Sequence, residues 1–207
     1  MAGELTEKGW RQELRALCPL VQNLRLMVGA ARHSFNRHST AHLAEMIQLG
    51  DNVTVNIDPF FEKAEKGLKG TAEPDRARWQ RLHDLLTHLE LMAVAIVSLE
   101  YPIREKIKDN IIFSDADVFY LNNLFSRQTG LLRTLEDVLH QDNASLKSYL
   151  LTEGRRVVDE SFEAAANHET HTLESMGQPR AWSVYLSLVD RHREILKHLL
   201  HIVQTLS

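Results

Sequence analysis

The sequence is poor in the residues that build disulfide frameworks and tight turns. Its single cysteine, Cys18, excludes a disulfide framework and any metal site made of several cysteines. Glycine and proline number only 9 and 5 in 207 residues, and aromatic residues make up 7%. With so few turn-forming residues, the chain is expected to form long helices joined by few connections.

Charge and hydropathy also exclude several classes of partner. The formal net charge is −4 and no basic block is present, so nucleic-acid binding has no electrostatic footprint. No apolar run reaches the roughly 18 residues of a membrane span; the longest, residues 89–99, is interrupted by Glu90 and Ser98. The N-terminus lacks the pattern of a secretion signal. We therefore expect a cytoplasmic protein with no direct membrane span.

Apolar residues recur at steps of three and four, which is the spacing of one helical face. Six stretches show this spacing, over residues 14–35, 43–68, 82–99, 121–138, 146–164 and 182–206. No stretch keeps a period of two, so strands are not expected. Repeats of this kind favour near-antiparallel packing, and the predicted fold class is all-α, with six long helices in bundles.

Turn and cap signals fall between these stretches, at residues 70–74, 101–102, 114–117, 142–143 and 177–179. Ser114 followed three residues later by Asp117 is typical of a helix start. Tyr101-Pro102 is expected to end the third helix. Pro59 inside the second stretch predicts either a kink or a restart with Asp58 as the N-cap.

The chain also resembles itself when it is shifted by 104 residues. The shift places Gly50 on Gly154, Val53 on Val157, His88 on His192 and Glu90 on Glu194. We interpret this as two repeated three-helix units, residues 1–100 and 101–207, that together form one helical protein. A chance alignment of two heptad-patterned segments is the alternative.

Two segments of the second half resemble PhoU-like proteins. The segment DNIIFSDADVFYLNNLF, with Phe113-Ser114 at its helix start, resembles the opening of the second repeat, especially in the cytoplasmic tails of bacterial sodium–phosphate cotransporters. The segment HETHTLESMGQPRAWSVYLSLVDRHREILKH resembles the family's end segment. The matching positions there are His168 or His171, Leu173, Gly177, Pro179, Tyr185, Leu186 and Leu188.

The resemblance covers residues 113–202 and reaches the first half only through the internal repeat. It implies two three-helix bundles and a non-enzymatic regulator that restrains phosphate uptake and signalling. The partners that it implies are a phosphate transporter component or a phosphate-sensing histidine kinase. A regulatory domain acting on a sodium–phosphate carrier is the alternative within the same fold. The oligomeric state, including a homodimer, is left open.

Some PhoU-like proteins carry metal ions on a Glu/Asp-x-x-x-Asp pattern, once per repeat. The matching pairs are Glu90 with Val94 and Glu194 with His198, so the first pair has lost a ligand and the second has gained an imidazole. An imidazole four residues from a carboxylate can still bind a transition metal on one helix face. The candidate metal residues are therefore Glu194, His198 and Glu90, with Asp190 and His201 nearby. The alternative is a solvated polar face, and no resident cofactor is expected.

Among the eleven histidines, one pattern suggests an enzyme. His83-Asp84 has the adjacent pair that all-helical metal-dependent phosphohydrolases use, and His33 and Asp137 are candidate partners. Neighbouring helix positions point about 100° apart, so both reach one ion only in a tight groove. Because Leu82 and Leu85 are expected to face the core, His83 and Asp84 should point sideways or outward. This phosphohydrolase is the alternative function.

A second histidine pattern, His38-x-x-x-His42 with Glu45 below, suits either a metal on one helix face or, more simply, a solvated face. The zinc-protease, ferritin-like and hemerythrin-like spacings do not occur in the sequence.

Nucleophilic catalysis and tight phosphate binding have no motif here. Cys18 lies beside an apolar helical face and is expected to be a small buried hydrophobe. The serines lack a Gly-x-Ser-x-Gly turn, and no Gly-rich phosphate loop is present. Two segments are candidate contact surfaces: Phe60-Phe61 with the lysines that follow, and the mixed-charge link at residues 101–110. The alternative for Phe60-Phe61 is that both rings pack inside the bundle.

Overall fold

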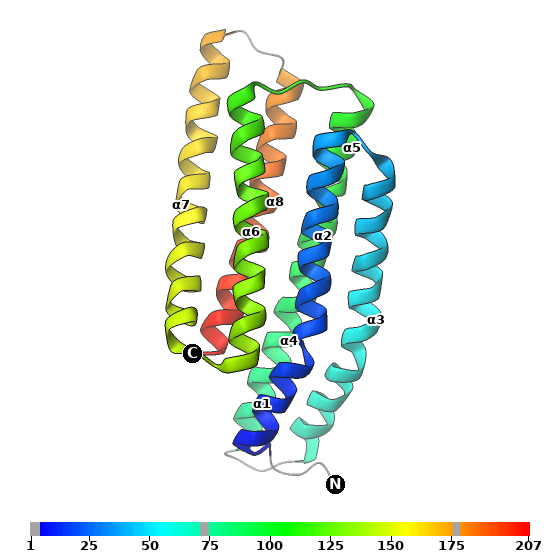
Figure 1. Cartoon of the computed structure of the whole chain (residues 1–207), viewed down its shortest axis with the longest axis vertical. Helices are drawn as coiled ribbons and strands as arrows, with labels where there is room; N and C mark the ends of the chain where they lie inside the picture. The colour runs from blue at the N-terminus through cyan, green and yellow to red at the C-terminus, as the bar shows by residue number, and fades with distance from the viewer. Residues whose placement is uncertain (1–4, 71–74, 176–178) are drawn as a thin grey trace.

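The computed structural model describes residues 5–70, 75–175 and 179–207 (Figure 1). Its helices are α1 (Glu7–Ala16), α2 (Cys18–Arg37), α3 (Thr40–Gly70), α4 (Asp75–Val97), α5 (Glu100–Lys108), α6 (Asp115–Gln141), α7 (Ala144–Ser175) and α8 (Pro179–Thr205). The described residues contain no strand, and the predicted all-α fold class is confirmed. The family-matching Gly177 and the side chains of His168, His171 and Leu173 lie outside what is described.

The eight segments form six long rods because two of the rods are interrupted near a proline. The first rod breaks at Leu17, just before Pro19 in the first turn of α2. The third breaks at residues 98–99, and Pro102 follows in the first turn of α5. A proline ring clashes with the carbonyl four residues earlier, so both breaks have the same steric cause. Tyr101-Pro102 was therefore wrongly expected to end a helix, and residues 101–110 are not a link but mostly helix α5.

Pro59 behaves differently, because α3 runs through it from Thr40 to Gly70 without restarting. The restart at Asp58 is therefore wrong. Proline leaves the carbonyl of Val55 without its helical donor. Both Pro59 and Val55 lie on the exposed side of α3, where water can supply the missing hydrogen bond.

Polar caps set the ends of α6 and the start of α7. Ser114 Oγ accepts a hydrogen bond from the Asp117 backbone N–H at 3.1 Å and donates to the Asp117 carboxylate at 2.6 Å, which confirms the predicted helix start. Asp142 ends α6 in the left-handed region at φ 51°. The Asn143 side chain then accepts from the backbone N–H groups of Ser145 and Leu146. These are the side-chain caps that satisfy helix ends.

The rods pack as two triplets that share one core. Helices α2, α3 and α4 contact one another, as do α6, α7 and α8, and the triplets meet where α4 packs along α8 and α2 along α6 (Figure 1). The buried apolar residues form one continuous cluster from Leu5 to Leu206. The boundary between residues 1–100 and 101–207 stays a prediction, since the two triplets form a single helical body.

Glycines let the outer helices approach the central ones closely. A Cβ on Gly50 in α3 would lie 2.7 Å from Val97 Cγ2, and a Cβ on Gly154 in α7 would lie 2.8 Å from Leu200 Cδ2. These two glycines are the pair that the 104-residue shift superposes, and each allows contact with the third helix of its own triplet. Glycine therefore serves here to permit close packing rather than a turn.

The segment Arg76–Lys108 is long and apolar enough to cross a membrane, with a mean hydropathy of 1.5 over its best window. Half of that window is buried inside the bundle. Helix α4 contacts α2, α3 and α8, so it is a central helix of the bundle. A buried core helix can be as long and as apolar as a helix that crosses a membrane.

Candidate functional site

Polar side chains gather where α4 packs along α8. Asp84 and His88 come from α4, and His198 and His201 come from α8; we call these four residues the α4–α8 cluster. Positions three or four apart lie on one face of a helix, so each helix presents its pair to the other. The cluster thus joins residues that are more than 100 positions apart in sequence.

The Asp84 carboxylate lies at the centre of the polar contacts. Its Oδ2 accepts a hydrogen bond from Thr205 Oγ1 at 2.8 Å and lies 3.2 Å from His201 Nε2. Its Oδ1 lies 3.9 Å from His88 Nε2. One carboxylate therefore faces two imidazole nitrogens and a hydroxyl.

The His88 ring contacts the rings of both other histidines of the cluster. His88 stacks on His201, with ring centroids 3.7 Å apart, and its Nδ1 lies 3.0 Å from Nδ1 of His198. The far side of His198 faces Glu194, with Nε2 3.5 Å from Oε1. The side chains of His88 and His198 are largely buried, whereas those of Asp84 and His201 are 46% and 45% exposed. The cluster is therefore open to solvent at Asp84 and His201.

The environment favours neutral rings at His88 and His198 beside a charged carboxylate. Burial lowers the pKa of His88, the charge of His201 lowers it further, and Asp84 only partly opposes this. Burial also lowers the pKa of His198, against the attraction of Glu194. Burial alone would raise the pKa of Asp84, but the hydrogen bond from Thr205 and the interaction with His201 outweigh it, and that pKa is lowered. Neutral imidazole and ionised carboxylate are the protonation states that bind metals.

Of the residues that the sequence proposed for a metal, the structure brings Glu194 and His198 together. Glu90 is two positions beyond His88, about 200° around α4, so it does not join them. Val94 is 60% exposed and supplies no ligand. Asp190 forms an ion pair with Arg193, and Glu194 pairs with Lys197 at 3.1 Å. The candidate metal set of Glu194, His198 and Glu90 stays a prediction.

The residues of the phosphohydrolase alternative point in different directions. The His83 ring packs edge-on against Phe61 of α3, with centroids 5.3 Å apart, whereas Asp84 faces α8. His33 packs against His42 instead of approaching Asp84. Asp137 lies on the exposed side of α6. The described geometry thus gives no groove in which His83 and Asp84 share an ion.

The pair His38 and His42 does not lie on one helix face. His38 ends α2 in the left-handed region at φ 51°, and its ring contacts the Lys106 amine. His42 belongs to α3 and lies 2.8 Å from the Ser39 hydroxyl. Reading these histidines as one helical face was wrong, because a helix boundary separates them.

Two further sequence expectations concern side chains in the packing. Cys18 is only half-buried; its Sγ lies 3.8 Å from the Glu136 carbonyl, and burial raises the pKa of the thiol. Phe60 and Phe61 are both half-buried against the core, so neither ring is fully exposed.

His192 is the one fully buried histidine among the described residues, and sequence reasoning gave it no role. Its Nδ1 lies 2.7 Å from Gln128 Oε1, while Gln128 Nε2 donates to the His192 carbonyl at 2.9 Å. The ring meets Phe125 edge-on, with centroids 4.4 Å apart. Burial lowers the pKa of His192 to about 3, so the ring is neutral. This histidine holds α8 against α6 and has no access to a ligand.

Sequence reasoning missed the cluster because its residues come from two helices. The signals in the sequence were Asp84 and His88 four residues apart, and His198 and His201 three apart. Each pair alone has the form of an ordinary solvated face. Only the packing of α4 on α8 brings the pairs together.

Comparison with known proteins supports the fold more than the family. No family model matches the chain, and no curated protein matches it. The chain does superpose on the crystal structure of the phosphate transport system regulatory protein PhoU from Streptococcus pneumoniae, with a TM-score of 0.80 and 11% sequence identity. The match covers 95% of this chain and 92% of that one. The chain therefore has a PhoU-like helical fold.

Proposed function

We propose that this chain is a cytoplasmic, non-enzymatic regulator of phosphate transport or signalling that acts through protein–protein contact. The observation that carries the proposal is the extent of the structural likeness, which spans 95% of this chain and 92% of the PhoU chain. The step from this fold to a function is made by analogy, because function resides in sites and not in the fold itself. The partner class is a phosphate transporter component or a phosphate-sensing histidine kinase.

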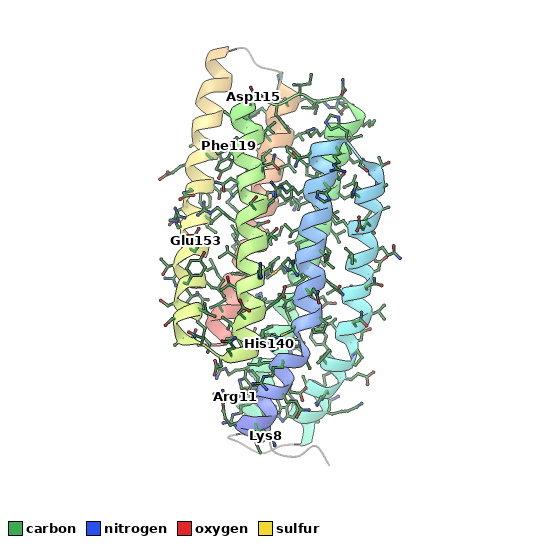
Figure 2. The ribbon with its side chains drawn as sticks, viewed as in Figure 1. Lys8, Arg11, Asp115, Phe119, His140 and Glu153 are labelled. Carbon is green, nitrogen blue, oxygen red and sulfur yellow. The ribbon has the colours of Figure 1, made fainter. Side chains whose placement is uncertain are left out.

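The surface of the protein offers apolar side chains for such a contact. Tyr101, Ile112 and Phe119 are 68%, 81% and 76% exposed. They belong to α5, to the connection after it and to the start of α6, and Figure 2 places Phe119 close to Asp115 at that end of the bundle. Exposed aromatic and aliphatic side chains are enriched at protein interfaces. This end of the bundle is the first surface to test for a partner.

The proposal is tested in cells of the source organism by deleting the gene and measuring uptake of labelled phosphate during growth in ample phosphate. We expect uptake to rise on deletion and to return when the wild-type chain is restored. A chain carrying Ile112→Ser and Phe119→Ser should fail to restore it. Val55→Ser, at a position 68% exposed on α3, is the matched control and should restore it fully.

Unchanged uptake after deletion would contradict the proposal. The phosphohydrolase alternative predicts instead that the purified chain hydrolyses a phosphate ester, and that His83→Ala and Asp84→Ala both abolish the activity. Hydrolysis by the wild type that is lost in both variants would support the phosphohydrolase and contradict the regulator.

A further inference from the structure

We propose that Asp84, His88 and His201 bind one divalent transition-metal ion, of the zinc class, and that this ion joins α4 to α8. The site differs from the positions that match the family pattern, which are Glu90 with Val94 and Glu194 with His198. It does not depend on the proposed function. The ligand atoms are one carboxylate oxygen and two imidazole nitrogens, which all lie within 4.8 Å of one another.

The distances between the ligand atoms suit a tetrahedral ion. Zinc binds imidazole nitrogen and carboxylate oxygen at about 2.0–2.2 Å, which sets the distance between two tetrahedral ligand atoms at about 3.4 Å. The observed separations are 3.2 Å from Asp84 Oδ2 to His201 Nε2 and 3.9 Å from Asp84 Oδ1 to His88 Nε2. The two contacts use different oxygens of Asp84, and the stacked rings of His88 and His201 lie with their centroids 3.7 Å apart. Rotation of the partly exposed His201 side chain out of the stack would turn both ring nitrogens toward one ion.

The surroundings of the site have the form of an outer ligand shell. With the ion on His88 Nε2, the Nδ1 of that ring carries a proton and donates to His198 Nδ1, 3.0 Å away. His198 then turns its Nε2 toward Glu194, 3.5 Å away. Thr205 donates to the Asp84 carboxylate at 2.8 Å. Such hydrogen-bonded chains orient metal-binding histidines and carboxylates. Glu194 and His198 are thus supporting residues here rather than ligands.

The chemistry of the ligands determines which kind of ion binds, and their exposure allows the ion to enter. Two imidazoles with one carboxylate suit zinc, copper or nickel, whereas magnesium and calcium prefer oxygen ligands alone. The partial exposure of Asp84 and His201 gives the ion a path from solvent. A water molecule would complete the coordination, as in sites with three protein ligands.

Binding at this place would stabilise the contact between the two triplets. Helix α4 belongs to the first triplet and α8 to the second, and they meet directly. An ion held by ligands from both helices resists their separation, because metal binding that occurs only in the folded state adds to its stability.

The test is a titration of the metal-free full-length chain with Zn²⁺ by calorimetry. Titration with Co²⁺ runs beside it, because visible absorption reports tetrahedral coordination. We expect one ion per chain in the wild type. His201→Ala should weaken binding at least about 10-fold and abolish the Co²⁺ spectrum. This variant should fold, because the His201 side chain is 45% exposed. His83→Gln, on α4 next to Asp84 but facing α3, is the matched control and should bind as the wild type does.

A second variant separates ligands from supporting residues. His198→Asn should keep the Co²⁺ spectrum and weaken Zn²⁺ binding about 10–100-fold, as loss of an outer-shell partner does. The proposal is overturned if the wild type binds less than one ion per chain. Equal binding by wild type and His201→Ala would also overturn it, and so would an equal loss in His83→Gln.

Discussion

His88 and His192 occupy matching positions in the two halves of the sequence, yet their surroundings are opposite. His88 lies in the α4–α8 cluster beside a carboxylate and two other imidazoles, in a site partly open to solvent. His192 is 0% exposed and contacts Gln128 and Phe125 of its own triplet. His88 thus reaches across to the other triplet, whereas His192 faces inward.

The comparison shows that the packing partner decides what a histidine can do. Each histidine lies on the third helix of its triplet, but α4 turns His88 toward α8 while α8 turns His192 toward α6. His192 is buried against the neutral amide of Gln128, so it has a structural role. His88 lies beside the partly exposed carboxylate of Asp84, so it is a candidate metal ligand. The predictions below test this division, in order of decreasing effect.

The largest effect is expected from breaking the buried pair. Gln128→Ala removes both hydrogen bonds to His192 and leaves a cavity at a position that is 1% exposed. We expect the free energy of unfolding to fall by about 2–4 kcal/mol, from the cavity and the unpaired polar groups together. Urea denaturation measures this. Gln141→Ala, at the exposed end of α6, is the control and should change stability by less than about 0.5 kcal/mol. An equally small change in Gln128→Ala would contradict the structural role of His192.

The next effect is a dependence of stability on pH, measured without metal. The pKa of His192 is about 3 in the folded chain, against 6.5 for an ordinary histidine. Between these pH values the unfolded chain binds more protons, so the free energy of unfolding falls as the pH falls. The contribution reaches about 1.4 kcal/mol per pH unit.

Denaturation curves at pH 7, 6, 5 and 4 test this dependence. His192→Gln should flatten the curve of stability against pH, because glutamine does not titrate. Gln141→Ala, the exposed control at the end of α6, should leave the slope as in the wild type. The same slope in His192→Gln and the wild type would show that the buried ring is not the source.

The smallest effect is expected in Zn²⁺ affinity. It distinguishes Glu90, which the sequence proposed as a ligand, from Asp84, which the structure places in the cluster. Glu90→Ala should leave Zn²⁺ affinity unchanged within about twofold, because Glu90 lies about 200° around α4 from His88. Asp84→Ala should weaken binding at least about 10-fold. Calorimetry on the two variants in parallel makes the comparison. A large loss of Zn²⁺ affinity in Glu90→Ala would indicate that the ion binds at the positions that match the family pattern.

Most of the fold could be predicted from the sequence, because helix formation here depends on local apolar spacing. Each of the six predicted stretches matches one rod, the last running one residue past the end of α8, and the Ser114 start was identified from its capping pair. The errors lay where a proline meets a helix: Pro102 interrupts a rod without ending it, and Pro59 is tolerated on an exposed face. Local patterns do not say whether water can replace a lost hydrogen bond.

The candidate site could be predicted only in part, because it depends on which helix faces which. The sequence pointed to Glu194 and His198; His198 is a member of the cluster, and Glu194 lies beside it. Asp84 was considered only with His83, its neighbour in sequence, although its contacts are with His201 and Thr205 of α8. Contacts across more than 100 residues follow from tertiary packing, which spacing along one helix does not contain.

The most direct test of this division between the two histidines is anomalous diffraction from crystals of the full-length chain grown with Zn²⁺. We predict one strong anomalous peak between Asp84, His88 and His201, and none beside His192. A peak at Glu90 or His192, or no peak at the α4–α8 cluster, would contradict the account.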